Sequence, residues 1–189
     1  MFHGSDFMFK KLDILDEKDS RLRKISKEAI LPLTKEYKDI INQIRTELRY
    51  SQIEEYEKKY NLRPGMGLAF PQLGINERII VIVYAYDDGE FEEYVVVNPK
   101  IVSTSDEMIA AEAGEGCVSV NRDVEGHVKR HARVTVEGYD VDGNKIRIRA
   151  REELAIAFQH EVDHLNGIIF YDRIDKNKPF FTEDEIRLI

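Results

Sequence analysis

The segment 152–167 constrains the fold most, because its composition predicts a buried helix that nevertheless carries titratable side chains. Its run 154–158 (LAIAF) is apolar, and no proline or glycine interrupts the segment before Gly167, a residue type that commonly ends helices. His160 and His164 are four residues apart, so on a helix their imidazoles lie one turn apart on the same face. Two imidazoles in this arrangement can bind one metal ion.

Glu161 completes the pattern His-Glu-x-x-His. In this pattern the histidines are neutral metal ligands, and the carboxylate stays off the metal as a base for a water molecule bound to it. The alternative interpretation is a core helix with two chance histidines. Burying a carboxylate and two imidazoles without a function would cost free energy, so we favour a metal site.

A catalytic metal of this kind needs a third protein ligand and keeps one position open. Cys117 is the only cysteine and follows a loop with glycines at 114 and 116, which let the backbone approach a ligand closely. Alternatively, Glu183 or Glu185 follows the second histidine at the distance used by metalloproteases of the thermolysin type. A lone intracellular cysteine is also often a small buried hydrophobe. The residues alone leave both candidates open.

The composition limits the classes of protein that the chain can belong to. Its 189 residues are 42% hydrophobic, which is enough for one domain with a core. The net charge of -8 argues against a general nucleic-acid binder. A single cysteine excludes an internal disulfide and fits a reducing compartment. No apolar run has membrane-spanning length and the start shows no secretion signal, so we expect a cytoplasmic protein, a monomer by default.

Runs of β-branched and aromatic residues separated by turn residues predict strands that pair through short turns. We therefore expect an α+β fold, with largely antiparallel sheets packed around the central His-Glu-x-x-His helix and a long N-terminal helix. One domain is expected over 1–189, in which residues 1–7 could form a mobile extension. Five N-terminal apolar residues are expected to pack against the body: Leu12, Ile14, Leu15, Leu22 and Ile25. The expected elements are a helix over 33–60 interrupted near 50–51, strands at 78–86, 91–98, 132–139, 145–149 and 168–171, a continuation of the sheet within 101–112, and a capped turn of a short helix at 182–185.

Three segments together resemble the signature motifs of the peptide deformylase family. They are 65–72 (GMGLAFPQ), 115–119 (EGCVS) and 159–164 (QHEVDH), and they occur in the family's order. The resemblance covers about residues 9–175, and the long insertion before the first segment is similar to the type II bacterial enzymes. Phe70 and Val118 depart from the usual Ala and Leu, and Phe70 is expected to narrow the rim of the pocket.

The resemblance implies that Cys117, His160 and His164 bind one divalent metal ion. In this family the physiological metal is Fe²⁺, and Zn²⁺, Ni²⁺ or Co²⁺ can substitute because thiolate and imidazole suit all of them. The reaction implied is removal of the N-formyl group from the N-terminal formylmethionine of newly synthesised polypeptides.

By the same resemblance, metal-bound hydroxide attacks the formyl carbon and formate is released, with Glu161 as general base and then general acid. The Gln72 amide and the Val118 backbone N–H match the family's donors to the oxyanion. The partners implied are N-formylmethionyl nascent peptides, and the resemblance also allows a transient ribosome contact.

The methionine side chain needs an apolar slot beside the metal, for which Ile156, Ala157 and Met66 are candidates, although Ile156 is equally typical of a core position. Glu115 is expected to pair with Arg130, as the family pattern suggests. The residues expected to line the substrate site are Gly65, Met66, Gly67, Glu115, Gly116, Ile156 and Ala157.

Two other functions stay open from the sequence. A thermolysin-like endopeptidase would use Glu183 or Glu185 as the third ligand. A non-catalytic, metal-bound interaction module would not need Glu161 as a base, so its replacement would be silent.

Overall fold

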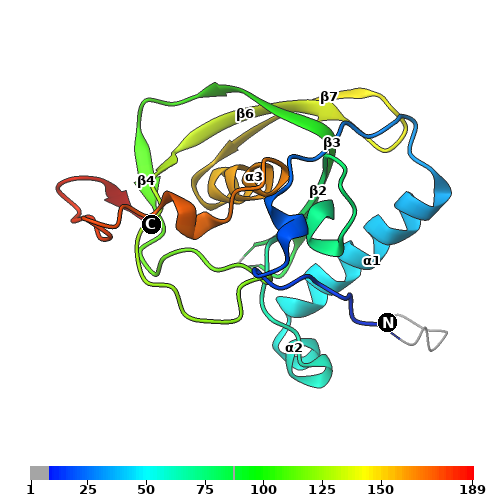
Figure 1. Cartoon of the computed structure of the whole chain (residues 1–189), viewed down its shortest axis with the longest axis horizontal. Coiled ribbons are helices and arrows are strands. Elements are labelled where there is room, and N and C mark those ends of the chain that lie inside the picture. Colours follow the sequence, from blue (N-terminus) through cyan, green and yellow to red (C-terminus); the bar gives the residue numbers. More distant parts are fainter. Residues whose placement is uncertain (1–8, 87) are drawn as a thin grey trace.

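The computed structural model describes residues 9–86 and 88–189 and confirms the α+β class (Figure 1). A five-stranded sheet has the order β1-β2-β3-β6-β7, and a three-stranded sheet has the order β5-β4-β8. The pairs in the larger sheet are all antiparallel. The extension predicted for residues 1–7 lies outside the described residues, and the single domain over 1–189 stays a prediction.

The α-helices are α1 (Lys35–Ser51), α2 (Glu54–Tyr60) and α3 (Glu152–Leu165), and the short 3₁₀ helices are η1 (Ser20–Arg23), η2 (Phe70–Leu73) and η3 (Phe170–Arg173). The strands are β1 (Gly67–Ala69), β2 (Ile79–Ala85), β3 (Phe91–Thr104), β4 (Met108–Ala110), β5 (Arg130–His131), β6 (Arg133–Tyr139), β7 (Lys145–Arg151) and β8 (Arg187–Leu188). In the described part of the chain, no helix has both the length and the apolar character needed to cross a bilayer.

β2 is apolar without alternation because both of its faces are covered. Ile79, Val81 and Val83 belong to the same buried cluster as the apolar side of α1. Ile80 and Ile82 belong to the cluster formed with α3 on the opposite face. A strand buried on both sides needs apolar residues at every position, which explains the run IIVIV.

The β6–β7 hairpin, by contrast, is covered on one face only. Along β7, exposed residues at 145, 147, 149 and 151 alternate with partly or fully buried ones. Ile146, Ile148 and Ala150 face α3 within the core cluster. The alternation in the sequence KIRIRAR therefore reports a sheet with one face in solvent.

α3 follows β7 without a loop and runs back under the sheet (Figure 1). Glu152 makes this reversal with a left-handed φ of 55°, while its N–H donates to the Ala132 carbonyl at 2.9 Å. Gly167, at φ 73°, ends the helix, and its N–H donates to the His164 carbonyl at 3.1 Å. A Cβ at Gly167 would lie 2.7 Å from the Arg23 carbonyl carbon, so glycine fits here both sterically and conformationally.

Both predicted hairpins are confirmed, as β2–β3 and β6–β7. The helix predicted over 33–60 is confirmed as two helices, with the break at 52–53 rather than at 50–51.

The expected continuation of the sheet within 101–112 is confirmed as far as Thr104, where β3 ends, whereas β4 joins the smaller sheet. Three other expectations were wrong in whole or in part. Residues 170–173 form η3, not a strand, and the Ile169 N–H donates to the Asp172 carboxylate at 2.9 Å to close that turn. Residues 182–185 form the expected capped turn, in which the Thr182 N–H donates to the Glu185 carboxylate at 3.1 Å, but the turn leads into β8 and not into a helix. Ile25 is 73% exposed.

Glu47 provides a test of how α1 packs against the N-terminal segment. Its side chain is buried and accepts a hydrogen bond from the Leu12 N–H at 2.6 Å. Burial raises the pKa of Glu47, although the Leu12 hydrogen bond partly opposes the shift. The folded protein therefore binds this proton more tightly than the unfolded chain, so the stability that Glu47 contributes falls as pH rises above about 4.3.

We predict that Glu47→Gln raises the urea midpoint at pH 7 and has no such effect at pH 4, because glutamine keeps the acceptor and removes the buried charge. Glu55→Gln, at an exposed position of α2, is the matched control for loss of one negative charge. Equal stabilisation by the two variants at pH 7 would contradict the prediction.

Candidate active site

α3 carries three of the candidate catalytic side chains. His160, Glu161 and His164 lie in its last two turns and are 9%, 4% and 1% exposed. The helix is buried along most of its length, so its polar groups need partners from other segments.

Cys117 reaches this helix from the loop 114–117. Its Sγ lies 3.3 Å from Nε2 of His164. The candidate ligand atoms of Cys117, His160 and His164 all lie within 4.8 Å of one another, and among residues 9–86 and 88–189 no other group of three such residues has this geometry. Glu183 and Glu185, the alternative ligands, are exposed, and Glu185 pairs with Lys178.

The chemistry of these residues fits a divalent metal ion. A thiolate and two imidazoles are ligands that iron, zinc, nickel and cobalt accept. Nδ1 of His160 donates to the Glu115 carboxylate at 2.9 Å, which leaves Nε2 of that ring free to bind a metal. Nδ1 of His164 and Oε2 of Glu161 are buried without a hydrogen-bond partner among the described residues. Three buried metal-ligand atoms and an unpaired carboxylate oxygen suit a cation and a water molecule bound to it.

A buried chain of charges holds this arrangement. Arg130, whose side chain is 3% exposed, donates to both oxygens of Glu115 at 2.8 and 2.9 Å, which confirms the expected pair. Its third nitrogen donates to Asp163 at 2.6 Å. Arg173 donates to both oxygens of Asp163, at 2.5 and 2.6 Å. The loop 114–117 is thereby fixed to α3 and to the segment after it.

Glu115 is ionised in this network. Burial, the largest single effect, acts to raise its pKa, but hydrogen bonds from Arg130 and His160 outweigh it and lower the pKa to about 2. An ionised Glu115 can only accept, so it fixes the proton of His160 on Nδ1.

Glu161 is placed differently. Burial raises the pKa of its carboxyl group to about 7. Such a group can both take up and release a proton near neutral pH. Gly67 of β1 packs directly on it, because a Cβ there would lie 2.8 Å from Cγ of Glu161. Only glycine lets β1 approach the carboxylate this closely.

Two candidate donors flank the thiol of Cys117. Gln72 is buried, with Nε2 lying 3.6 Å from the Sγ atom and its Oε1 accepting from the Ala69 N–H at 2.9 Å. Val118 follows the cysteine, and within the described residues its backbone N–H makes no hydrogen bond to the protein. The Val118 N–H is free to serve a ligand in the pocket, and the Gln72 amide lines the pocket while it also donates to Ser119 Oγ at 3.1 Å.

A pocket of about 270 Å³ opens beside these groups. Every residue predicted for the site lines it except His164, which lies deeper. Ile156 serves both of its predicted roles, since it lines the pocket and packs with Ile109 and Ala132 in a small core cluster. The prediction that Phe70 narrows the rim was wrong, because Phe70 is fully buried and packs edge-on to Tyr37 at 5.4 Å.

Sequence reasoning missed four lining residues, namely Pro64, Ala111, Gly114 and Glu153. Glu153 precedes Ala157 by one helical turn, so the helix period could have identified it. Ala111 follows β4 and carries no local signal.

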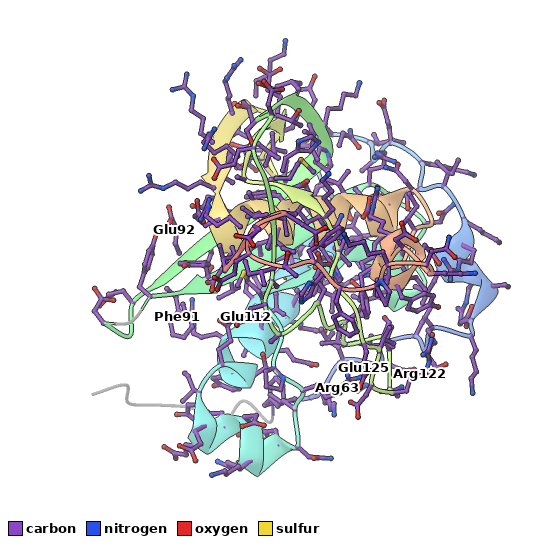
Figure 2. The ribbon with its side chains drawn as sticks, turned by 90° about the vertical axis from the view of Figure 1, so that its left-hand side faces the viewer. Arg63, Phe91, Glu92, Glu112, Arg122 and Glu125 are labelled. Carbon is purple, nitrogen blue, oxygen red and sulfur yellow. The ribbon has the colours of Figure 1, made fainter. Side chains whose placement is uncertain are left out.

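The loop 114–117 also borders a second hollow, of about 560 Å³, on its other side. Arg63, Glu112, Arg122 and Glu125 lie around this region (Figure 2). Arg63 donates to the carbonyl oxygens of Val118 at 3.2 Å and of Val120 at 2.7 Å, which holds the turn after Cys117 in place.

Comparisons with known proteins agree with this geometry. The family model described as polypeptide deformylase matches residues 11–180. Peptide deformylase 2 of Geobacillus stearothermophilus is 44% identical over 172 residues, which cover 91% of this chain and 94% of that protein. A probable peptide deformylase from Synechococcus phage S-SSM7 has a TM-score of 0.71 at 32% identity, covering 86% of this chain and 99% of the other. A class I type b peptide deformylase from Acinetobacter baumannii, crystallised with Met-Ala-Ser, has a TM-score of 0.70 at 28% identity, covering 88% and 100%.

The fold and the site define a hydrolase of the His-Glu-x-x-His class. More particularly, the chain belongs to the polypeptide deformylase family.

Arg130 offers a direct test of the buried charge network. We predict that Arg130→Met lowers the free energy of unfolding by about 3–5 kcal/mol, because it leaves Glu115 and Asp163 buried with one partner fewer. Arg147→Met, which removes the exposed pair with Glu137 on β7, should change stability by about 0–1 kcal/mol. Urea unfolding of both variants measures the difference, and a similar small loss in each would contradict a structural role for the network.

Proposed function

We propose that this protein removes the N-formyl group from the N-terminal formylmethionine of newly synthesised polypeptides and releases formate. The observation that carries the proposal is the convergence of Cys117, His160 and His164 beside the buried Glu161, in a member of the deformylase family. The relative from Acinetobacter baumannii binds Met-Ala-Ser, a peptide that begins with methionine. We assign the protein to the cytoplasm, acting as a monomer on nascent peptides.

In this proposal Cys117, His160 and His164 hold one divalent metal ion, with Fe²⁺ as the physiological choice and Zn²⁺, Ni²⁺ or Co²⁺ as substitutes. The metal would supply a Lewis acid that lowers the pKa of a bound water molecule, to about 7 in good zinc sites. Glu115 and Arg130 hold His160 in the orientation and protonation state that a ligand needs.

Glu161 moves the proton. Its carboxylate takes a proton from the attacking water and hands it to the amine that leaves the formyl carbon. The raised pKa suits both steps near neutral pH. The Gln72 amide and the Val118 N–H donate to the oxyanion that forms on the formyl oxygen, where loss of one donor typically costs about 2.7–4 kcal/mol in the barrier.

The pocket receives the methionine side chain. Ile156, Ala157 and Met66 supply apolar contacts, as an unbranched thioether side chain requires. Gly65, Gly67 and Gly116 leave the backbone accessible to the peptide main chain.

The test is formate release from formyl-Met-Ala-Ser by protein prepared anaerobically with Fe(II), with an acetyl-blocked peptide assayed for internal cleavage. We expect formate without internal cleavage. Glu161→Gln should keep the metal and lose about 10²–10⁴-fold in turnover, and Cys117→Ala should lose the metal. Glu183→Gln, at an exposed carboxylate, should keep both metal and turnover.

Internal cleavage without formate would indicate an endopeptidase instead. Full turnover by the Glu161 variant would remove that residue from proton transfer. Metal binding without either reaction would support a non-catalytic module.

A further inference from the structure

The solvent face of the β6–β7 hairpin carries a concentration of positive charge that the deformylase reaction does not use. We define it as the basic face, formed by Arg133 on β6 and Lys145, Arg147, Arg149 and Arg151 on β7. All five residues are exposed. Figure 2 shows nitrogen-tipped side chains standing out around the yellow ribbon of this part of the sheet, away from the interior.

The strand register places these side chains on one face. Arg133 lies directly opposite Arg151, Thr135 opposite Arg149, and Tyr139 opposite Lys145. Directly opposed residues of antiparallel strands share a face, and like charges in that position destabilise the pair. Arg133 and Arg151 are therefore like charges in direct opposition, of which, among the residues that the structure describes, only Arg133 has a carboxylate partner, Glu107.

The protein neutralises only part of this charge. Arg147 pairs with Glu137 at 2.5 Å, and Arg133 pairs with Glu107 at 2.6 Å. Within residues 9–86 and 88–189, Lys145, Arg149 and Arg151 form no ion pair. Three cations on one open face are thus available to an external anion, although the whole chain has a net charge of -8.

A hollow of about 480 Å³ lies on this face, between the end of β3 and β7. Arg133, Arg149 and Arg151 line it together with the hydroxyl-bearing residues Ser103, Thr104, Ser105 and Thr135. Guanidinium groups and hydroxyls are the side chains that donate hydrogen bonds to phosphate oxygens. The hollow therefore combines charge with the hydroxyls of Ser103, Thr104 and Thr135, whereas the Ser105 hydroxyl already donates to the Glu107 carbonyl at 2.8 Å.

Protection of an edge strand does not account for these features. β7 is an edge of the larger sheet, and charged residues on edge strands prevent unwanted pairing. Charges on β7 alone would serve that purpose. Arg133 also lies on β6, which is paired on both sides and has no edge to protect.

We propose that the basic face binds the phosphate backbone of RNA. Alternate residues of a strand are about 6.8 Å apart, so Arg149 and Arg151 present their guanidinium groups in a row that can follow successive phosphates. Arginine suits this partner because its planar group donates two parallel hydrogen bonds to a phosphate. The choice of RNA over other polyanions rests on the proposed function, since a nascent polypeptide is made on an RNA-rich particle. The contact is weak and salt-sensitive, and it does not read sequence.

The experiment measures fluorescence anisotropy of a labelled RNA hairpin with the metal-loaded protein, from 50 to 200 mM salt. We expect a Kd on the order of 10 µM at 50 mM salt. Arg149→Gln/Arg151→Gln should bind at least about tenfold more weakly, and the slope of log K against log salt should fall by roughly 0.7–0.9 for each phosphate that the variant no longer neutralises. Lys58→Gln/Lys59→Gln removes the same charge from exposed positions on α2 and should bind within about twofold of the natural protein.

Several results would overturn the proposal. These are no RNA binding by the natural protein at 50 mM salt, equal weakening in the two double variants, and binding to vesicles rich in phosphatidylserine in preference to RNA. Formate release from the free peptide should be unchanged in Arg149→Gln/Arg151→Gln, which shows that the variant is folded. If the natural protein binds RNA but releases no formate, the proposed function is rejected and the proposal that the basic face binds RNA is kept.

Discussion

The buried pair between Arg130 and Glu115 is the interaction on which the candidate site depends. It joins the loop 114–117 to β5 of the smaller sheet, and the bond from Arg130 to Asp163 extends the network to α3. Ion pairs removed from water stabilise a protein only when their hydrogen bonds are satisfied on all sides, and here each carboxylate has at least two donors. The same pair that holds the loop also sets the proton of His160. Fold and chemistry therefore rest on one set of charges.

The two halves of the larger sheet differ in which helices cover them. The β1-β2-β3 half is covered by α1 and α3. It places Gly67 of β1, and Gln72 of the following η2, in the lining of the pocket. The β6–β7 half, covered only by α3, leaves a face in solvent. One helix thus serves as the core of both halves and as the carrier of the catalytic side chains, which explains why its sequence is apolar around a polar motif.

The sequence predicted those parts whose signals are local. The His-Glu-x-x-His pattern, the β-branched runs and the turn residues indicated α3 and the two hairpins. The third ligand was different, because Cys117 lies far from His160 in the chain and only the fold brings them together. Without the family resemblance, the choice between Cys117 and the glutamates at 183 and 185 stayed open.

Other features depend on pairings that no local pattern records. β8 exists because two residues near the C-terminus pair in parallel with β4, and η3 replaced a strand because Asp172 captures a backbone N–H. Arg173 has no neighbour in sequence that marks it as a partner of Asp163. The basic face could not be predicted from the net charge, because the charge of the whole chain does not say where its cations lie on the surface.

The central claim is that a loop thiolate and two helix imidazoles form one metal site, and an anaerobic titration of the metal-free protein with Co(II) tests it most directly. The account predicts saturation at one Co(II) per chain, visible bands of a four-coordinate ion and an ultraviolet band from thiolate-to-cobalt charge transfer, which Cys117→Ala abolishes. Saturation at one equivalent without the thiolate band, or with the band retained in the alanine variant, would contradict it.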